Sequence, residues 1–140
     1  MFKNILVPID GSPVSLRAVD LAIEFSMRDG SKLTLLHVVV PPAMGISQAA
    51  LEEMQKAGES ALEMGESRCR SFGLTARKLL KTAEGNRSST ANEIAREVID
   101  GRYDLVILGS RGYAGERGIL MGSVAVSLAI SLPCTTIIVR

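Results

Sequence analysis

The chain has 140 residues, 46% of them hydrophobic, and its 16 basic and 15 acidic residues give a formal net charge of +1. This size and apolar content predict one globular domain over residues 1–140. The mixed, nearly balanced charge argues against a nucleic-acid-binding surface built on bulk positive charge. No apolar run is long enough for a signal peptide or a membrane span, so we expect a cytoplasmic protein without a membrane partner.

The first predicted elements are a short buried strand at residues 3–8 and the helix that follows it. Ser12 suits the N-cap of this helix, and Pro13 suits its first position, where a missing N–H costs nothing. Gly30 should end the helix. Its inner face is predicted to carry Leu16, Val19, Ile23 and Met27. Residues 32–40 are too apolar to expose either face, which predicts a second buried strand.

The middle of the chain predicts a long helix, a polar strand and a shorter helix. Small and apolar residues recur at three-four spacing over residues 47–72, which indicates an amphipathic helix. Residues 74–82 are more polar and predict a third strand near a sheet edge. Thr90 and Glu93 have the spacing of a capping box, so a helix should begin there and close at Gly101. The residues predicted to face inward from it are Ile94, Val98 and Ile99.

The last predicted elements are a fourth strand at 105–108, a fourth helix at 124–132 and a fifth strand at 135–139. Strand and helix therefore alternate throughout, which predicts an α/β fold with helices on both faces of a parallel sheet. Ligands bind such sheets beyond the carboxyl ends of the strands, where neighbouring connections leave to opposite faces. If strands one and four are neighbours, residues 8–12 and the glycines after residue 108 frame one crevice.

Three glycines and a serine after the fourth strand have the spacing Gly109-x2-Gly112-x9-Gly122-Ser123. Glycine leaves main-chain N–H groups open to phosphate oxygens, and a helix that begins at Ser123 would point its unpaired N–H groups at the same place. The spacing therefore predicts one anion site. The alternative is that these are turn and cap glycines without a ligand.

This spacing resembles the nucleotide-binding pattern of the universal stress protein family, in its ATP-binding branch. The similarity extends to residues 5–12, 36–38 and 104–112 and so covers nearly the whole chain. It implies a three-layer α/β sandwich with a five-stranded parallel sheet in the order 3-2-1-4-5, flanked by four helices. It also implies a bound adenine nucleotide, ATP or else ADP or AMP, with Mg2+ or Mn2+ held mainly by the phosphates.

The resemblance also assigns residues to the parts of the nucleotide. Pro8 and Asp10 would lie beside the nucleoside, and the backbone of Val38 would meet the adenine. Leu108 and Gly109 would border the ribose and phosphates. The residues around the phosphate chain would be Arg111, Gly112, Gly122, Ser123 and Val124.

The chain departs from the family pattern at two places. Ala125 stands where some relatives carry a hydroxyl, and residues 85–88 lack a proline often found there. The missing hydroxyl removes one donor from the predicted phosphate site.

Enzyme classes that need particular motifs are poorly supported. The chain has neither a P-loop ending in Gly-Lys-Ser or Gly-Lys-Thr nor a dinucleotide fingerprint after its first strand. His37, the sole histidine, is better explained as a hydrogen-bonded structural residue than as part of a serine triad. Asp10 has no second acidic partner in view, so we predict no catalytic residue and at most slow ATP hydrolysis or autophosphorylation.

Two functions of different classes remain open. One is a nucleotide-binding stress-response or signalling module, and the other is a nucleotide-independent interaction protein that works as a dimer. Under both, residues 135–140 form an apolar edge that would be hazardous if left open. Since family members commonly pair through the last strand, the resemblance implies a homodimer through these residues.

Overall fold

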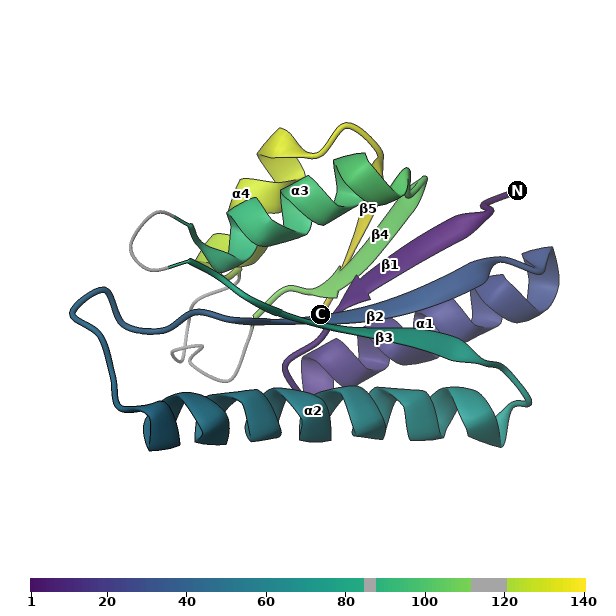
Figure 1. The fold of residues 1–140 in the computed structure, drawn as a ribbon. Helices are drawn as coiled ribbons and strands as arrows, with labels where there is room; N and C mark the ends of the chain where they lie inside the picture. Colours follow the sequence, from purple (N-terminus) through teal and green to yellow (C-terminus); the bar gives the residue numbers. More distant parts are fainter. Residues whose placement is uncertain (85–87, 112–120) are drawn as a thin grey trace.

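The computed structural model describes residues 1–84, 88–111 and 121–140, and strand and helix alternate through them (Figure 1). The elements are β1 (Asn4–Pro8), α1 (Pro13–Asp29), β2 (Lys32–Val39), α2 (Gln48–Ser71), β3 (Ala76–Thr82), α3 (Thr90–Gly101), β4 (Leu105–Gly109), α4 (Ser123–Ser131) and β5 (Thr135–Val139). None of the helices in these parts of the chain combines the length and apolar character needed to span a bilayer.

The strands of the described residues form one parallel sheet in the order β3-β2-β1-β4-β5. Ile5 of β1 pairs with Leu33 of β2 on one side and with Leu105 of β4 on the other. β3 and β5 are the outer strands of this sheet. The predicted strand order and the parallel arrangement are confirmed, and strands one and four are neighbours.

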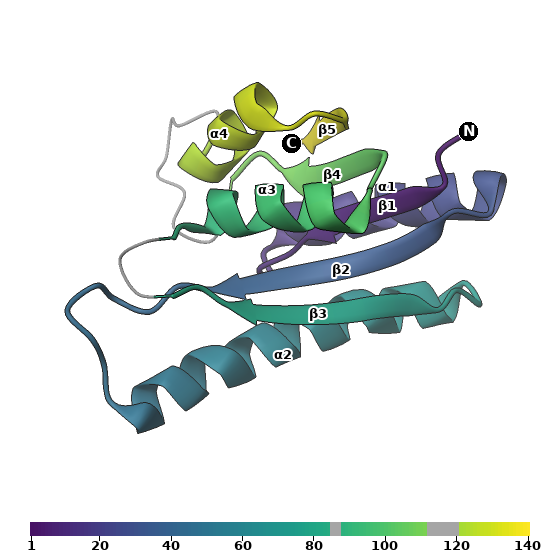
Figure 2. The same ribbon diagram turned by 45° about the horizontal axis from the view of Figure 1, so that its top comes forward.

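Two apolar cores lie on opposite faces of the sheet. Figures 1 and 2 show α1 and α2 covering one face and α3 and α4 covering the other. Ile5 and Val7 of β1 pack with α1 and α2, while Leu6 between them packs with α3 and α4. All three side chains are fully buried, and each such burial stabilises the fold by about 1.5–3 kcal/mol. The three-layer α/β sandwich follows from strands that are apolar on both faces.

The helix α1 begins and ends as its sequence predicts. The Ser12 hydroxyl accepts a hydrogen bond from the Ser15 N–H at 3.2 Å, and Pro13 is the first helical residue. Gly30 ends the helix in the left-handed conformation, with φ of 69°, which glycine adopts at little cost.

The predicted N-cap of α3 is wrong, whereas its predicted end at Gly101 is confirmed. Ser89, not Thr90, is the N-cap, and its hydroxyl accepts a hydrogen bond from the Asn92 N–H at 3.2 Å. Gly101 is the last helical residue, and Arg102 takes the left-handed conformation instead, with φ of 54°. A Cβ on Gly101 would lie 2.3 Å from the Tyr103 ring, so this glycine serves close packing.

Two residues predicted to face inward are exposed. Ile99 is 63% exposed because it follows Val98, which is buried, and lies about 100° further around the helix. Met27 is 57% exposed, since the buried residue of that turn is its neighbour Ser26. The buried apolar face of each helix is therefore narrower at this position than its apolar residues alone suggest.

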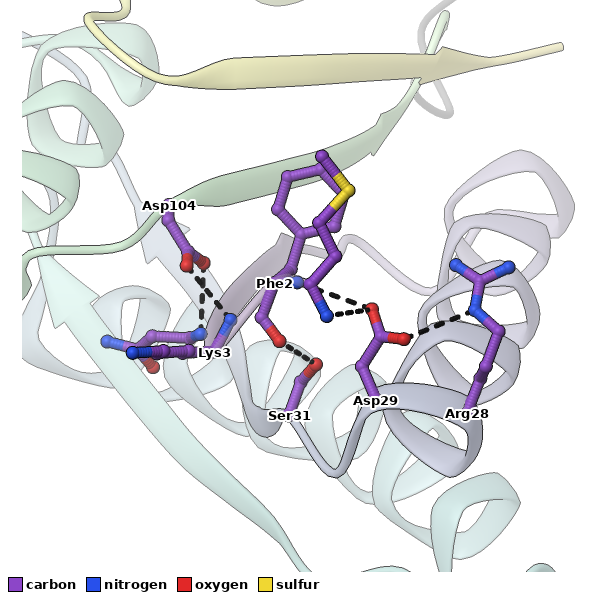
Figure 3. Close-up of polar contacts among 8 residues, drawn as sticks. Phe2, Lys3, Arg28, Asp29, Ser31 and Asp104 are labelled. Atoms are coloured by element: carbon purple, nitrogen blue, oxygen red, sulfur yellow. Dashed lines mark hydrogen bonds and ion pairs between the residues drawn. The ribbon is translucent and has the colours of Figure 1, made fainter.

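The amino ends of the strands are tied together by carboxylates (Figure 3). The two oxygens of Asp104 accept hydrogen bonds from the Lys3 and Asn4 N–H groups, each at 2.9 Å. Asp29 accepts one from the Phe2 N–H at 3.3 Å and pairs with the amino group of Met1 at 3.1 Å. These contacts join the start of β1 to the start of β4 and to the end of α1.

Candidate functional site

A pocket of about 530 Å³ opens at the carboxyl ends of β1, β2 and β4. We call it the strand-end pocket, and its volume is typical of small-molecule sites. The helix that follows β1, α1, packs on one face of the sheet, and the helix that follows β4, α4, packs on the other. Pockets form where neighbouring strands connect to opposite faces in this way. The segments that contribute to its walls are residues 8–10, 36–38, 108–111 and 121–125, with Ser15, Thr90 and Ile94.

The turn after β1 forms one wall of the pocket and is held by hydrogen bonds. The Ile9 N–H donates to the Leu36 carbonyl of β2 at 2.8 Å. A carboxylate oxygen of Asp10 accepts from the Ser12 N–H at 2.9 Å, which closes a local turn before α1. The Ser15 hydroxyl accepts from the Asp10 N–H at 3.4 Å. Asp10 therefore lies in a position that both β2 and α1 define.

The segment after β4 and the start of α4 form the opposite wall. The Ser110 N–H donates to the Val139 carbonyl of β5 at 2.7 Å, and the Gly122 N–H donates to the Ser110 carbonyl at 2.6 Å. Gly122 is the N-cap of α4 and has no side chain with which to cap it. The first residues of this helix, Ser123 and Val124, line the pocket. A helix N-terminus and an exposed guanidinium, that of Arg111, thus lie at one place, which favours an anionic ligand.

The two glycines of this wall serve different purposes. A Cβ on Gly109 would lie 2.7 Å from Cγ1 of Val14 and 3.2 Å from the backbone nitrogen of Ser15, so glycine lets β4 approach the start of α1. A Cβ on Gly122 would meet the Ser110 carbonyl oxygen at 3.5 Å, an ordinary contact. The bare backbone that the sequence predicts at Gly109 is therefore required by the protein's own packing.

The structure brings together nine of the ten residues predicted to bind nucleotide. The tenth, Gly112, lies outside the described residues. The nine that line the strand-end pocket are Pro8, Asp10, Val38, Leu108, Gly109, Arg111, Gly122, Ser123 and Val124. Their assignment to parts of a nucleotide stays a prediction.

Several wall residues were not predicted from the motif. Thr90 and Ile94 come from the start of α3, which joins the pocket because α3 and α4 pack on the same face of the sheet. The others are Ile9, Ser15, Leu36, His37, Ser110 and Met121, while Ala125, which the sequence analysis already placed at the phosphate site, also lines the pocket. Most of these flank a predicted residue in sequence, and that proximity was the one signal available for them.

The described residues contain no group of three or more histidine, cysteine, aspartate or glutamate side chains suited to hold a metal ion. Asp10 is the acidic residue among those that line the pocket.

Comparison with known proteins gives one family. The chain matches the family model described as "Universal stress protein family" over residues 1–140. Universal stress protein YxiE of Bacillus subtilis (strain 168) is 28% identical to it, with all of both chains covered. The solved structure of universal stress protein UspA from Lactobacillus plantarum has a TM-score of 0.81 at 23% identity and covers 99% of this chain and 98% of its own.

Three further structures with this fold are nucleotide complexes. A universal stress protein in complex with cAMP has a TM-score of 0.76 at 24% identity and covers 99% of this chain and 97% of its own. The universal stress protein from Archaeoglobus fulgidus in complex with dAMP gives 0.77 at 16% identity, covering 100% and 98%. A family protein from Arabidopsis thaliana with AMP bound gives 0.63 at 19% identity, covering 97% and 90%. At these identities the likeness shows the fold.

Proposed function

This chain belongs to the universal stress protein family, and from that premise we propose that it binds an adenine nucleotide in the strand-end pocket. The observation that carries the proposal is the meeting of Arg111 and the start of α4 in a pocket of about 530 Å³. A guanidinium and helix N–H groups suit a phosphate, and the apolar wall suits a base. The relatives that hold cAMP, dAMP and AMP support the same ligand class.

The proposed pose runs across the pocket from β2 to α4. The adenine meets the backbone of Val38, and the nucleoside lies beside Pro8 and Asp10. Leu108 and Gly109 border the ribose. The proposed phosphate ligands are Arg111, Gly112, Gly122, Ser123 and Val124.

Within the cell we propose a cytoplasmic stress-response or signalling module whose nucleotide acts as a signal or a stabilising ligand. ATP is the proposed ligand, with ADP and AMP as alternatives and with Mg2+ or Mn2+ held mainly by the phosphates. Asp10 faces the pocket without a second carboxylate among the described lining residues, so at most slow hydrolysis or autophosphorylation is proposed. The alternative function is a nucleotide-independent dimeric interaction protein.

Isothermal titration calorimetry separates these two functions. The wild type is titrated with ATP, ADP and AMP, each with and without Mg2+, beside the matched variants Gly122→Asp and Gly122→Asn. Either new side chain can cap α4, because Asp and Asn are both favoured at an N-cap. The Asp variant alone adds a negative charge at the proposed phosphate site.

We expect the Asp variant to bind nucleotide at least tenfold more weakly than the wild type, and more weakly than the Asn variant. Either capping side chain occupies helix N–H groups that the phosphate would use, and the Asp carboxylate also repels the phosphate. Both variants should unfold at or above the wild-type temperature, which shows that the loss is local. A wild type that binds none of the three nucleotides eliminates this function and leaves the interaction protein.

A homodimer through residues 135–140 is the second part of the proposal. β5 is an outer strand of the described sheet, and its residues Ile137, Ile138 and Val139 are half-buried. Ile130 on the adjoining α4 is 81% exposed. An uncovered apolar edge of this kind favours pairing with a second copy.

Sedimentation velocity tests the dimer directly. The wild type should sediment as a dimer at micromolar concentrations. The substitution Thr135→Lys, at an exposed position, should shift the population toward monomer without lowering the unfolding temperature of the monomer, because charged residues protect edge strands. A wild type that stays monomeric over the same concentrations would rule this interface out.

A further inference from the structure

His37 joins the wall of the strand-end pocket to the turn after β1. Its Nδ1 lies 2.7 Å from the Ile9 carbonyl oxygen. A carbonyl only accepts, so Nδ1 carries the proton and donates. Ile9 lies one residue beyond β1, and its own N–H donates to the Leu36 carbonyl at 2.8 Å. Both backbone groups of Ile9 are therefore held by neighbouring residues of β2.

The imidazole also packs against α2, at a glycine in the middle of the helix. A Cβ on Gly58 would lie 2.5 Å from Cδ2 of His37 and 3.1 Å from its Nε2. It would also lie 2.8 Å from Cδ1 of Leu80, the end of a flexible side chain. Glycine within a helix costs about 1 kcal/mol relative to alanine. The glycine at position 58 therefore destabilises α2 slightly, but it leaves room for the imidazole ring.

We propose that His37 is a positioning residue for nucleotide binding, acting through the Ile9 carbonyl on the turn that carries Asp10. The inference rests on the proposed function of the pocket. Residues 8–10 and His37 line the same pocket, and Asp10 follows directly after the carbonyl that His37 holds. Without the Nδ1 donor, Ile9 loses the bond from its carbonyl to β2, and the nucleoside contacts move with the turn. A displacement near 1 Å is enough to weaken a well-oriented contact strongly.

Two substitutions at position 37 separate donation from packing. His37→Leu fills most of the ring's volume but cannot donate, while His37→Asn retains an N–H donor near the position of Nδ1. Measured by titration calorimetry with Mg-ATP, the Leu variant should bind about tenfold more weakly than the wild type and the Asn variant within about threefold. Rescue by Asn is the readout that a merely structural role would not give.

A substitution outside the pocket supplies an independent route. Gly58 does not line the strand-end pocket, yet Gly58→Ala should push the imidazole off the Ile9 carbonyl and weaken Mg-ATP binding severalfold. In the His37→Asn background the ring atoms that the new methyl meets are gone. The double variant should then bind as well as His37→Asn alone and unfold at a higher temperature, because alanine favours the helix.

The outcomes divide clearly. Equal weakening by Gly58→Ala in both backgrounds, or a His37→Leu variant that binds Mg-ATP as the wild type does, overturns the positioning role alone. A wild type that binds no adenine nucleotide overturns the proposed function and this inference together. In the supporting case, a 15N–1H correlation spectrum of the wild type shows the His37 proton on Nδ1, and the Asp10 amide signal moves more in His37→Leu than in His37→Asn.

Discussion

The two ends of the sheet handle their polar groups in opposite ways. At the amino end, the carboxylates of Asp29 and Asp104 accept hydrogen bonds from the N–H groups of Phe2, Lys3 and Asn4 (Figure 3). At the carboxyl end, the start of α4 and the exposed Arg111 bring donors to the wall of a pocket. At the amino end the donors bond to the chain's own carboxylates, whereas at the carboxyl end the donors lie on the wall of a pocket.

This contrast separates stability from binding. Changes at the amino end should lower the free energy of unfolding and leave nucleotide affinity unchanged in the folded protein. Changes at the carboxyl end should lower affinity with little effect on unfolding. The predictions that follow test where this division holds and where it fails.

Gly109 should be an exception to this separation of stability from binding, because it lies at the carboxyl end and its substitution should cause the largest loss of stability. Valine there would drive its Cβ against Cγ1 of Val14 and the backbone of Ser15, which a side-chain rotation cannot relieve. We expect Gly109→Val to lower the free energy of unfolding by about 3 kcal/mol, measured by urea titration. Gly122→Ala is the control, since its methyl makes ordinary contacts, and it should change stability by about 0.5 kcal/mol at most. Equal stability of the two variants would refute the packing role of Gly109.

Asp104 gives the next largest effect and sharpens the comparison. Asp104→Ala removes the acceptor for two backbone N–H groups, so the free energy of unfolding should fall by about 2 kcal/mol. Asp104→Asn keeps one acceptor oxygen and should lose about half as much. Calorimetric titration with Mg-ATP should give the wild-type affinity for both variants. A tenfold loss of affinity would instead mean that the two ends are coupled through β1 and β4.

Much of the fold follows from the sequence because its signals are local. Apolar strands such as residues 5–7 and capped starts such as Ser12 predict their elements without any long-range information. The sheet order and the pocket position followed from the family resemblance and from the rule that parallel sheets bind ligands at their carboxyl ends. Nine predicted residues lie together for that reason.

The failures arise where distant residues decide. Gly101 packs closely on the Tyr103 ring, and the residue that takes the left-handed conformation is Arg102. The contact between Gly58 of α2 and His37 of β2 joins two elements, and no local sequence pattern predicts it. At Gly109 the sequence predicts a ligand contact but not the close approach of Val14 and Ser15 at the start of α1. Packing between elements is what a single sequence leaves undetermined.

Arg111 tests the binding side of the comparison, with a smaller expected effect. Arg111→Gln keeps a polar side chain of similar length but removes the charge, so affinity for Mg-ATP should fall about tenfold, equal to about 1.4 kcal/mol. The affinity for adenosine should hardly change, because adenosine has no phosphate. Since Arg111 is exposed, the urea midpoint should stay at the wild-type value. Equal losses for both ligands would move Arg111 away from the phosphates.

The smallest effect concerns Asp29 and appears as a pH dependence. A hydrogen bond from the amino terminus, partly opposed by burial and helped by Arg28 and the Phe2 N–H, holds the pKa of Asp29 below its ordinary value of 3.8. A lowered folded-state pKa stabilises the protein above the unfolded pKa, and that contribution disappears as pH falls through the folded value. Asp29→Asn should therefore unfold at a lower temperature than the wild type at pH 7, and the gap should narrow below pH 4. Glu63, whose pKa is lowered by Arg70 and Lys78, titrates in both proteins and cancels in the difference. A gap that stays constant from pH 7 to pH 3 would mean that Asp29 acts through its hydrogen-bond geometry and not through its charge.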